Sequence, residues 1–233
     1  MRGKLIVIEG TESSGKETQT KLLVEALNKR NVKIERLSFP CYDTATGKII
    51  GACYLGKKEL CNKYLKDSNS WFEEGTGEVE GLVSSLFYAA DRKYNIKQIE
   101  DLLNKGINVV LERYTFSNMA HQGGKMNTQE ERFQFFKKME VLEFDLLNLP
   151  KPDLVILLYV PYQITAKLLE TRDNTKRDIK DLRRAEQTYL ELRALYKFKM
   201  VECTKNNEMR TIDSIHLEVL ANVLEMLEIK GEV

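Results

Sequence analysis

The stretch that decides the fold runs from residue 5 to residue 23 and reads LIVIEGTESSGKETQTKLL. An apolar run ends at Glu9, a Gly-x4-Gly-Lys loop occupies residues 10–16, and an apolar-periodic segment follows Lys16. The glycines permit backbone conformations that a Cβ would obstruct, so N–H groups can face phosphate oxygens while Lys16 adds a positive charge. This strand–loop–helix pattern is typical of a phosphate-binding P-loop. The alternative is an ordinary βα turn that contains two glycines.

The loop and first helical turn predict the contacts to a bound nucleotide triphosphate. The expected ATP-binding residues are Gly10, Thr11, Glu12, Ser13, Ser14, Gly15, Lys16, Glu17 and Thr18. Glu17 stands where such loops carry the Ser or Thr whose hydroxyl binds Mg²⁺, and Thr18 is rotated by about 100° around the helix. Glu17 either holds the metal, directly or through water, or repels the nucleotide.

Composition narrows the class of protein. The 233 residues are 42% hydrophobic, enough for one domain spanning residues 1–233. A net charge of +1 predicts no general affinity for nucleic acid, and no apolar stretch is long enough to span a membrane. Cys41, Cys53, Cys61 and Cys203 form no CxxC pair, which argues against a zinc site or disulfide framework and favours a cytoplasmic protein.

Apolar, β-branched runs alternate with helical patterns along the chain. The predicted strands are Leu5–Ile8, Ile34–Phe39, Asn108–Leu111, Leu154–Tyr159 and Lys199–Cys203. The predicted helices are Lys16–Lys29, Thr46–Leu55, Glu78–Asn104, Thr128–Leu147, Tyr162–Thr171, Lys180–Tyr196 and Thr211–Glu228. This alternation predicts an α/β protein with a five-stranded parallel sheet flanked by helices.

A charged pair ends the third predicted strand, at Glu112 and Arg113. The carboxyl ends of parallel strands line the ligand crevice of an open α/β sheet, so both side chains should face the P-loop. Glu112 is then a carboxylate on the metal side, and Arg113 clamps a phosphate because a guanidinium matches phosphate oxygens. The equal alternative is a structural ion pair at a strand end.

Tyr88 and Arg92 are four residues apart on one predicted helix and so share a face. An aromatic ring and an arginine in this arrangement can stack on a planar base and bind its carbonyl edge. A core aromatic beside a surface charge is the simpler interpretation when the pair is considered alone. His121, in the polar segment that ends at Gly124, is by itself more often a packed or solvated histidine than a catalyst.

Taken together, these motifs resemble the thymidylate kinase family of P-loop nucleoside monophosphate kinases over nearly the whole chain. The resemblance rests on the P-loop, Phe39-Pro40, Tyr88-Ala89-Ala90-Asp91-Arg92, Glu112-Arg113-Tyr114, Ser117, Ala120-His121-Gln122-Gly123-Gly124 and Pro152-Asp153-Leu154. It implies a three-layer P-loop NTPase fold with a mobile lid. It also implies ATP-dependent phosphorylation of dTMP to dTDP with Mg²⁺ as cofactor.

The resemblance also implies roles for individual residues. The expected acceptor-site residues are Glu12 toward the sugar 3′-hydroxyl, Tyr88 stacked on thymine, Arg92 on the base carbonyl, Arg113 on the acceptor phosphate, and Phe39, Ser117, His121 and Gln122 around the pocket. Glu17 and Glu112 are the expected metal-side residues. Lys16, Arg113 and Glu12 are expected to act in catalysis.

Two further expectations concern moving and assembling parts. Ser13 stands where one class of the family carries a P-loop arginine, so the catalytic cation is expected from a lid at about 172–180, from Arg177 or Arg172. The family forms homodimers through helices packed across a two-fold axis, and the helix Glu78–Asn104 offers a candidate surface.

The chain departs from the family pattern at several positions. Cys41 and Tyr42 stand where an acceptor-phosphate arginine is expected, and Glu112 replaces a shorter Asp. His121 stands where the family's aromatic residue disfavours a 2′-hydroxyl. Alternative functions are therefore a kinase for another nucleotide or deoxynucleoside, or a nucleotide-binding protein with weak activity. A GTPase switch is disfavoured because no Asn-Lys-x-Asp segment is present.

Overall fold

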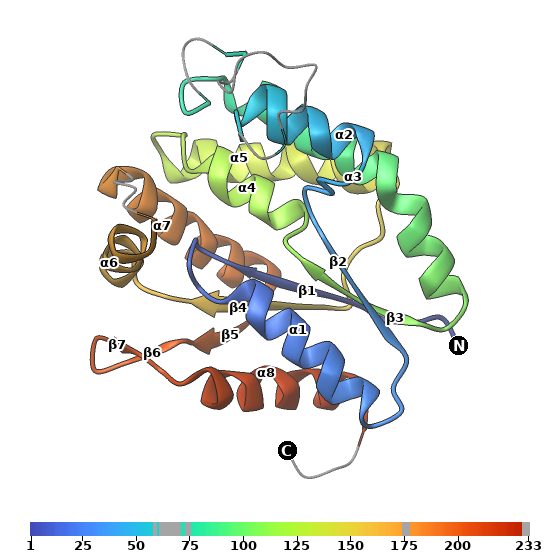
Figure 1. The fold of residues 1–233 in the computed structure, drawn as a ribbon. Helices are drawn as coiled ribbons and strands as arrows, with labels where there is room; N and C mark the ends of the chain where they lie inside the picture. Colours follow the sequence, from blue (N-terminus) through green and yellow to red (C-terminus); the bar gives the residue numbers. More distant parts are fainter. Residues whose placement is uncertain (58–59, 61–70, 73–75, 174–177, 230–233) are drawn as a thin grey trace.

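Five parallel strands form the centre of the protein, in the order β2-β3-β1-β4-β5 (Figure 1). The computed structural model describes all residues except 58–59, 61–70, 73–75, 174–177 and 230–233. The strands are β1 (Leu5–Gly10), β2 (Ile34–Ser38), β3 (Asn108–Glu112), β4 (Leu154–Tyr159) and β5 (Lys199–Glu202). The five predicted strands and the parallel sheet are therefore confirmed.

The central strand β1 is buried along its whole length and pairs with β3 on one side and β4 on the other. Ile8 lies opposite Glu112 of β3, and Gly10 lies opposite Leu158 of β4. This register brings the start of the P-loop and the charged end of β3 to the same edge of the sheet.

Helices α1 (Lys16–Asn28), α6 (Tyr162–Asp173) and α8 (Ile212–Met226) cover one face of the sheet. Alternate strand residues point to this side, including Ile6, Ile8, Val110, Ile156 and Val201. They pack with leucines of α1 and with the apolar stripe of α8 in one buried cluster. The period-two pattern of the strands thus supplies one half of the core.

Helices α3 (Gly81–Asn104), α4 (Thr115–Gly123), α5 (Gln129–Glu140) and α7 (Ile179–Tyr196) cover the other face. The intervening strand residues, such as Val7, Val109, Leu111 and Leu157, point to this side. The result is the three-layer α/β arrangement that the alternation of strands and helices predicts.

Several elements differ from the predictions in detail. The predicted helix at 46–55 is a short α2 (Ala45–Lys48) followed by the π-helical η1 (Ile49–Tyr54), and α5 likewise continues into η3 (Val141–Leu146). The sequence did not predict the hairpin of β6 (Thr204–Lys205) and β7 (Glu208–Met209). Its two turn residues both have positive φ, as a type I′ turn requires.

Helix α4 was also missed, because the interaction that starts it comes from far away in the chain. The Glu9 carboxylate is fully buried and accepts hydrogen bonds from the backbone N–H groups of Tyr114 (2.9 Å) and Ser117 (3.0 Å). It also accepts from the Ser117 hydroxyl (2.6 Å) and the Tyr189 hydroxyl (3.1 Å). A negative group satisfies the free N–H groups at a helix start and suits the helix dipole. No local pattern around α4 contains this signal.

The predicted lid at about 172–180 falls between α6 and α7, and part of it lies outside the described residues. Arg177 and the side chain of Arg172 are among the parts not described. Asp178 caps α7 by accepting a hydrogen bond from the Lys180 backbone N–H at 2.9 Å. The lid and its catalytic arginine therefore stay predictions.

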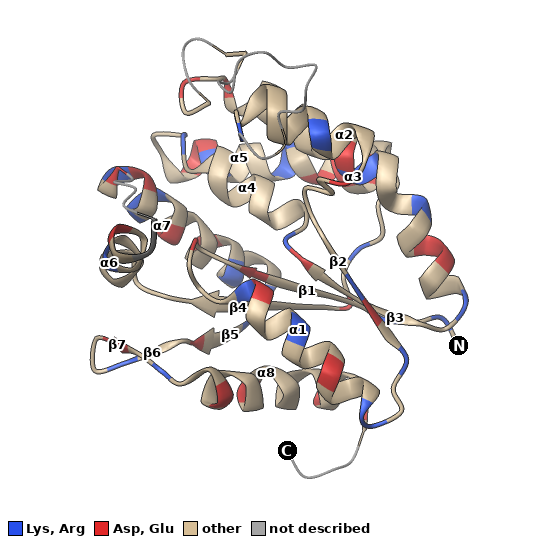
Figure 2. Ribbon diagram, in the orientation of Figure 1, with Lys and Arg blue, Asp and Glu red and all other residues tan. Residues whose placement is uncertain are grey.

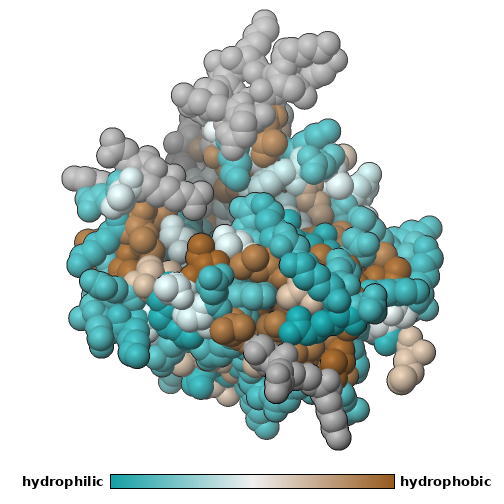
Figure 3. All heavy atoms as spheres, turned by 60° about the horizontal axis from the view of Figure 1, so that its bottom comes forward, coloured by the Kyte–Doolittle hydropathy of each residue, from teal (hydrophilic) through white to brown (hydrophobic). Residues whose placement is uncertain are grey.

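Charged residues of both signs are interspersed on the helices of both outer layers, in keeping with the net charge of +1 (Figure 2). On the face seen in Figure 3, hydrophobic residues lie among hydrophilic ones. None of the described helices combines the length and apolar character needed to cross a bilayer.

Glu9 should be a major contributor to stability. Replacing Glu9 with Ala leaves two backbone N–H groups and two hydroxyls without their buried acceptor, and we expect unfolding free energy to fall by about 3 kcal/mol. Urea denaturation measures this change. Glu35→Ala, at an exposed position of β2, is the matched control and should shift stability by no more than about 0.5 kcal/mol. Equal losses for the two variants would contradict the assigned role.

Candidate active site

A cleft of about 1220 Å³ opens at the carboxyl edge of the sheet, above β1 and β3. The predicted site residues that line it are Glu12, Ser13, Gly15, Lys16, Glu17, Thr18, Phe39, Tyr88, Arg92, Glu112, Arg113, Ser117, His121 and Gln122. Gly10, Thr11 and Ser14 belong to the same loop without lining the cleft. The structure therefore brings the described predicted residues together around one cavity and its loop.

The loop backbone takes conformations that only special residues adopt easily. Gly10 has φ +154°, and a Cβ there would lie 2.6 Å from the Leu158 carbonyl oxygen. Gly15 is left-handed (φ +83°) and directly precedes α1. Ser14 closes the loop by donating its hydroxyl to the Thr11 carbonyl at 2.9 Å. The two glycines thus meet the steric requirement inferred from the sequence.

Lys16 is buried beneath the loop, although its amine is charged in water. Its Nζ donates to the Thr11 carbonyl at 2.6 Å and lies 3.3 Å from the Ser14 hydroxyl. Burial lowers the pKa of Lys16 to about 7, and the positive charge of Arg113 acts in the same direction. The amine is therefore ready to gain a proton when anionic phosphates arrive.

On the side where a metal is expected, Glu112 is paired with a residue that the sequence analysis missed. Arg36 of β2 contacts the Glu112 carboxylate at 2.5 Å and donates its Nε to the Thr20 hydroxyl at 2.8 Å. The sequence gives only a weak indication of this role for Arg36, because a single arginine within a predicted strand is not a motif. Because Arg36 also lines the cleft, it adds a guanidinium near Lys16 and Arg113.

Glu17 lies on α1 at the cleft and forms an (i, i+4) ion pair with Lys21 at 2.7 Å. Its side chain is 63% exposed, so any contact to a metal would lie at the edge of the site. Among the described residues, no three His, Cys, Asp or Glu side chains gather in a metal-binding group. The roles of Glu17 and Glu112 toward a metal stay predictions.

Arg113 has a strained backbone at the cleft. Its φ is +64°, a left-handed value that is uncommon for a residue with a side chain and is frequent at functional sites. Its Nη1 lies 3.4 Å from the Ser117 hydroxyl and 3.3 Å from His121 Nε2. In the described part of the chain it forms no ion pair, so its charge faces the cleft without a carboxylate partner at contact distance.

Cys41 brings no charge to the cleft region. Its N–H donates to the Asp91 carboxylate at 2.8 Å, and its thiol donates to the Ser38 carbonyl at 3.2 Å. Burial, with a smaller contribution from the negative charge of Asp91, raises the pKa of the Cys41 thiol to about 12. The position where the family carries a phosphate-binding arginine is therefore neutral here.

Tyr88 and Arg92 lie on α3 and line the cleft. Tyr88 packs edge-on against Tyr54, with ring centroids 6.0 Å apart. Arg92 is almost fully buried and forms two hydrogen bonds to Glu143. The two residues share the helix face that their spacing predicts.

Two polar groups from α4 also face this region. Asn118 and Gln122 line the cleft, are buried, and each has a side-chain oxygen with no hydrogen-bond partner in the described structure. Buried polar atoms are normally paired, so a free acceptor beside a cavity indicates a donor on a ligand. Asn118 was missed by the sequence analysis because α4 itself was missed.

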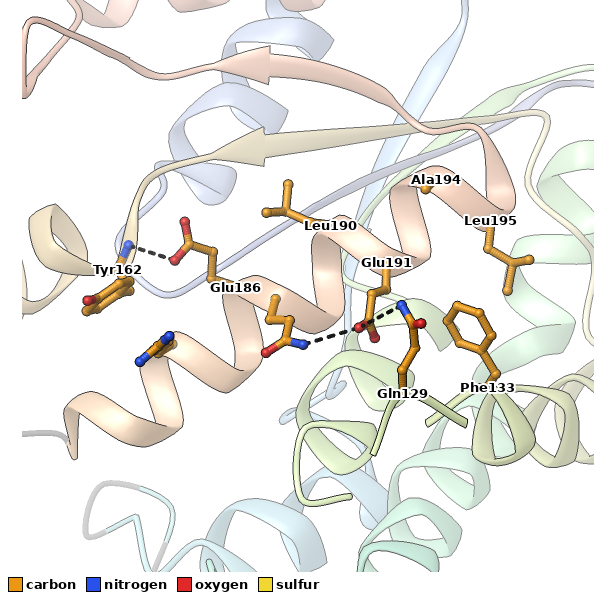
Figure 4. Close-up of a pocket in the computed structure, with 10 residues that line it drawn as sticks. Gln129, Phe133, Tyr162, Glu186, Leu190, Glu191, Ala194 and Leu195 are labelled. Carbon is orange, nitrogen blue, oxygen red and sulfur yellow. Dashed lines mark hydrogen bonds between the residues drawn. The ribbon is translucent and has the colours of Figure 1, made fainter. Parts of the chain in front are cut away.

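A second, smaller hollow of about 710 Å³ lies between α5 and α7 (Figure 4). Glu191 of α7 accepts from Gln129 and Gln187 there, and Arg132 donates two hydrogen bonds of 2.6 Å to it. None of the predicted site residues lines this groove. Its contacts fasten α7 to α5 on the side of α7 away from the cleft.

Comparisons with known proteins agree on one family. The family model described as thymidylate kinase matches residues 8–214. Thymidylate kinase of Plasmodium falciparum is 30% identical over 97% of this chain and 91% of its own, and the human enzyme is 31% identical over 94% and 88%. The structure of thymidylate kinase from Candida albicans matches with a TM-score of 0.66 at 25% identity, covering 97% of this chain and 93% of that one.

The lowered pKa of Lys16 predicts proton uptake on ATP binding. Near pH 8 the free amine is mostly neutral, and the phosphates should raise its pKa and draw in up to about one proton per site. Titration calorimetry in buffers of different ionisation enthalpy measures this number. Lys16→Arg, which stays charged, is the control and should take up fewer protons. Equal uptake by both proteins would contradict the assignment.

Proposed function

Because the chain belongs to the thymidylate kinase family, we infer that it transfers the γ-phosphoryl group of ATP to dTMP, giving ADP and dTDP. One observation carries this conclusion: a single cleft is lined both by the P-loop with Lys16 and by Arg113, Tyr88 and Arg92. Phosphoryl transfer depends on holding two phosphates in line and stabilising the charge between them.

The P-loop binds the donor in this proposal. Its N–H groups and the start of α1 suit the β- and γ-phosphates, and the Lys16 amine moves from the Thr11 carbonyl to the phosphate oxygens. Arg36 lines the same cleft, with its charge compensated by Glu112 at contact distance. A buried, water-poor site strengthens each of these contacts.

In this proposal, the part of the cleft lined by Arg113, Tyr88 and Arg92 binds the acceptor. Arg113 takes the dTMP phosphate, because its guanidinium has no carboxylate partner in the described chain and can bind two phosphate oxygens. Tyr88 stacks on the base, Arg92 binds a base carbonyl, and Glu12 reaches the sugar 3′-hydroxyl. Phe39, Ser117, His121 and Gln122 complete the wall, although the Ser117 hydroxyl is committed to Glu9.

Mg²⁺ fits the residues present. Glu112 supplies a hard carboxylate oxygen inside the cleft and Glu17 another at its edge, and Mg²⁺ commonly binds through one or two carboxylates plus phosphates and water. Bound there, the ion would neutralise charge on the donor phosphates. Arg36 holds Glu112 in place by donating a hydrogen bond to its Oε2.

Arg177 or Arg172 supplies the remaining cation in this proposal, since Ser13 provides none. Both belong to the stretch that runs from the last turn of α6 to the start of α7. The cytoplasmic location is part of the same proposal. It is supported by the free thiols of Cys41 and Cys203, which suit a reducing compartment.

A second candidate is a kinase that also accepts other deoxynucleoside monophosphates. The neutral Cys41 and the contact of His121 with Arg113 favour it, because both alter the acceptor site relative to the family pattern. Broad substrate specificity is described for the thymidylate kinase from Candida albicans. Relative kcat/KM values across a nucleotide panel distinguish the two candidates.

Steady-state turnover with ATP, Mg²⁺ and a panel of nucleoside monophosphates tests the function. We expect dTMP to have the highest kcat/KM, and Arg113→Ala to raise the KM for dTMP by about 100-fold while changing the KM for ATP little. Lys16→Met should lower kcat by orders of magnitude. Turnover of another monophosphate in preference to dTMP would overturn the proposal.

A homodimer through α3 completes the proposal. Leu82 and Leu86 form a short (i, i+4) stripe on this helix and are 41% and 49% exposed. An apolar stripe of this kind suits an isologous contact between two copies. Light scattering should give twice the mass of one chain. Leu86→Glu should give monomers, whereas Leu217→Glu on α8 should leave the dimer intact; a monomeric wild type would refute the contact.

A further inference from the structure

We propose that Glu143 is a positioning residue for the acceptor base, which neutralises and orients Arg92 so that this guanidinium reads an uncharged carbonyl. The inference rests on the proposed function and adds a residue that does not line the cleft. It explains why two arginines of one cavity should bind different parts of one nucleotide.

The contact between the two side chains is bidentate. Arg92 Nε donates to Glu143 Oε2 at 2.5 Å, and Arg92 Nη2 donates to Glu143 Oε1 at 2.5 Å. The side chains are 3% and 0% exposed. Two parallel hydrogen bonds fix the plane of a guanidinium, so Arg92 presents its remaining N–H groups in one direction.

Glu143 is held in turn by α4. Asn118 Nδ2 lies 3.3 Å from Glu143 Oε1. The side-chain oxygen of Asn118, Oδ1, has no hydrogen-bond partner in the described structure. Arg92 Nη1 lies 3.5 Å from the Tyr114 carbonyl. The carboxylate, Arg92 and the free acceptor of Asn118 therefore form one fixed unit beside the cavity.

Packing alone does not explain a carboxylate at this position. Phe135, Phe136 and Met139 form the buried stripe of α5, and Glu143 continues it four residues later, in the π-helical η3. A buried ion pair adds little stability compared with apolar side chains of the same shape. Short π-helical segments inside helices are frequent at functional sites. These facts favour a role in ligand recognition.

The charges around Arg113 and Arg92 support different roles for the two arginines, one toward a phosphate and one toward an uncharged group. Arg113 forms no ion pair within the described residues; Glu9, Glu12 and Glu112 act on its charge only from beyond contact distance, so a phosphate meets no carboxylate bound to it. Arg92 is compensated by Glu143 at contact distance, which weakens its attraction for an anion but leaves N–H groups for a neutral acceptor. A pyrimidine 4-carbonyl fits this donor, whereas a 4-amino group does not.

Glu143→Gln tests the proposal, with Glu191→Gln as the matched control. Glu191 accepts the same bidentate contact from Arg132, the pair is similarly buried (8% and 10% exposed), and it lies at the α5–α7 groove away from the cleft (Figure 4). Both substitutions remove one charge and replace an acceptor oxygen by an NH₂ group that opposes the guanidinium.

Glu143→Gln should raise the KM for dTMP by about tenfold or more and reduce the preference for dTMP over dCMP, with kcat and the KM for ATP changed by less than about threefold. Glu191→Gln should lower the melting temperature to a similar degree and leave the KM for dTMP unchanged. Glu143→Asp, which keeps the charge, should restore part of the preference for dTMP.

The double variant Arg92→Met/Glu143→Met removes both charges and guards against misfolding of the single variant. It should fold and should raise the KM for dTMP at least as much as Glu143→Gln. An unchanged KM and unchanged dTMP-to-dCMP preference in folded Glu143 variants would overturn the positioning role alone. A wild type that prefers another monophosphate would overturn the proposed function, and the same comparison on that nucleotide then decides the role of Glu143.

Discussion

The buried carboxylate of Glu9 is the interaction on which the site depends. Glu9 lies in the central strand directly before Gly10, the first residue of the P-loop, and accepts hydrogen bonds from the start of α4 and from Tyr189 of α7. One charged group with four donors can be buried because each oxygen is satisfied. The strand that leads into the P-loop thereby also fixes the positions of α4 and α7.

Three cations of the cleft differ in their surroundings, and this gives each a different chemistry. Lys16 is buried with a lowered pKa, so its charge depends on what occupies the cleft. Arg113 keeps its charge without an ion-pair partner in the described chain, held by a strained backbone that β3 and α4 enforce. Arg92 is neutralised by Glu143 and suits an uncharged acceptor. If only the residue types were known, all three side chains would be expected to bind phosphate.

Helix α7 connects the cleft to the rest of the helical layer. Tyr189 contacts Glu9 and lies edge-on to His121, while Arg184 lines the cleft. On its opposite side, Glu191 binds Arg132 of α5. Contacts on both sides therefore set the position of α7 beside the cleft. The residues that make them are far from their partners in the sequence.

The sequence by itself determined the alternation of strands and helices, the P-loop, and the charged end of β3, because these depend on local periodicity and on residues a few positions apart. It also placed Tyr88 and Arg92 on one helix face. Only the tertiary structure decided that α4 forms, that Arg36 holds Glu112, and that Glu143 neutralises Arg92. Each of these depends on a charged group meeting donors from a distant segment, and no pattern of local hydrophobicity encodes such a meeting.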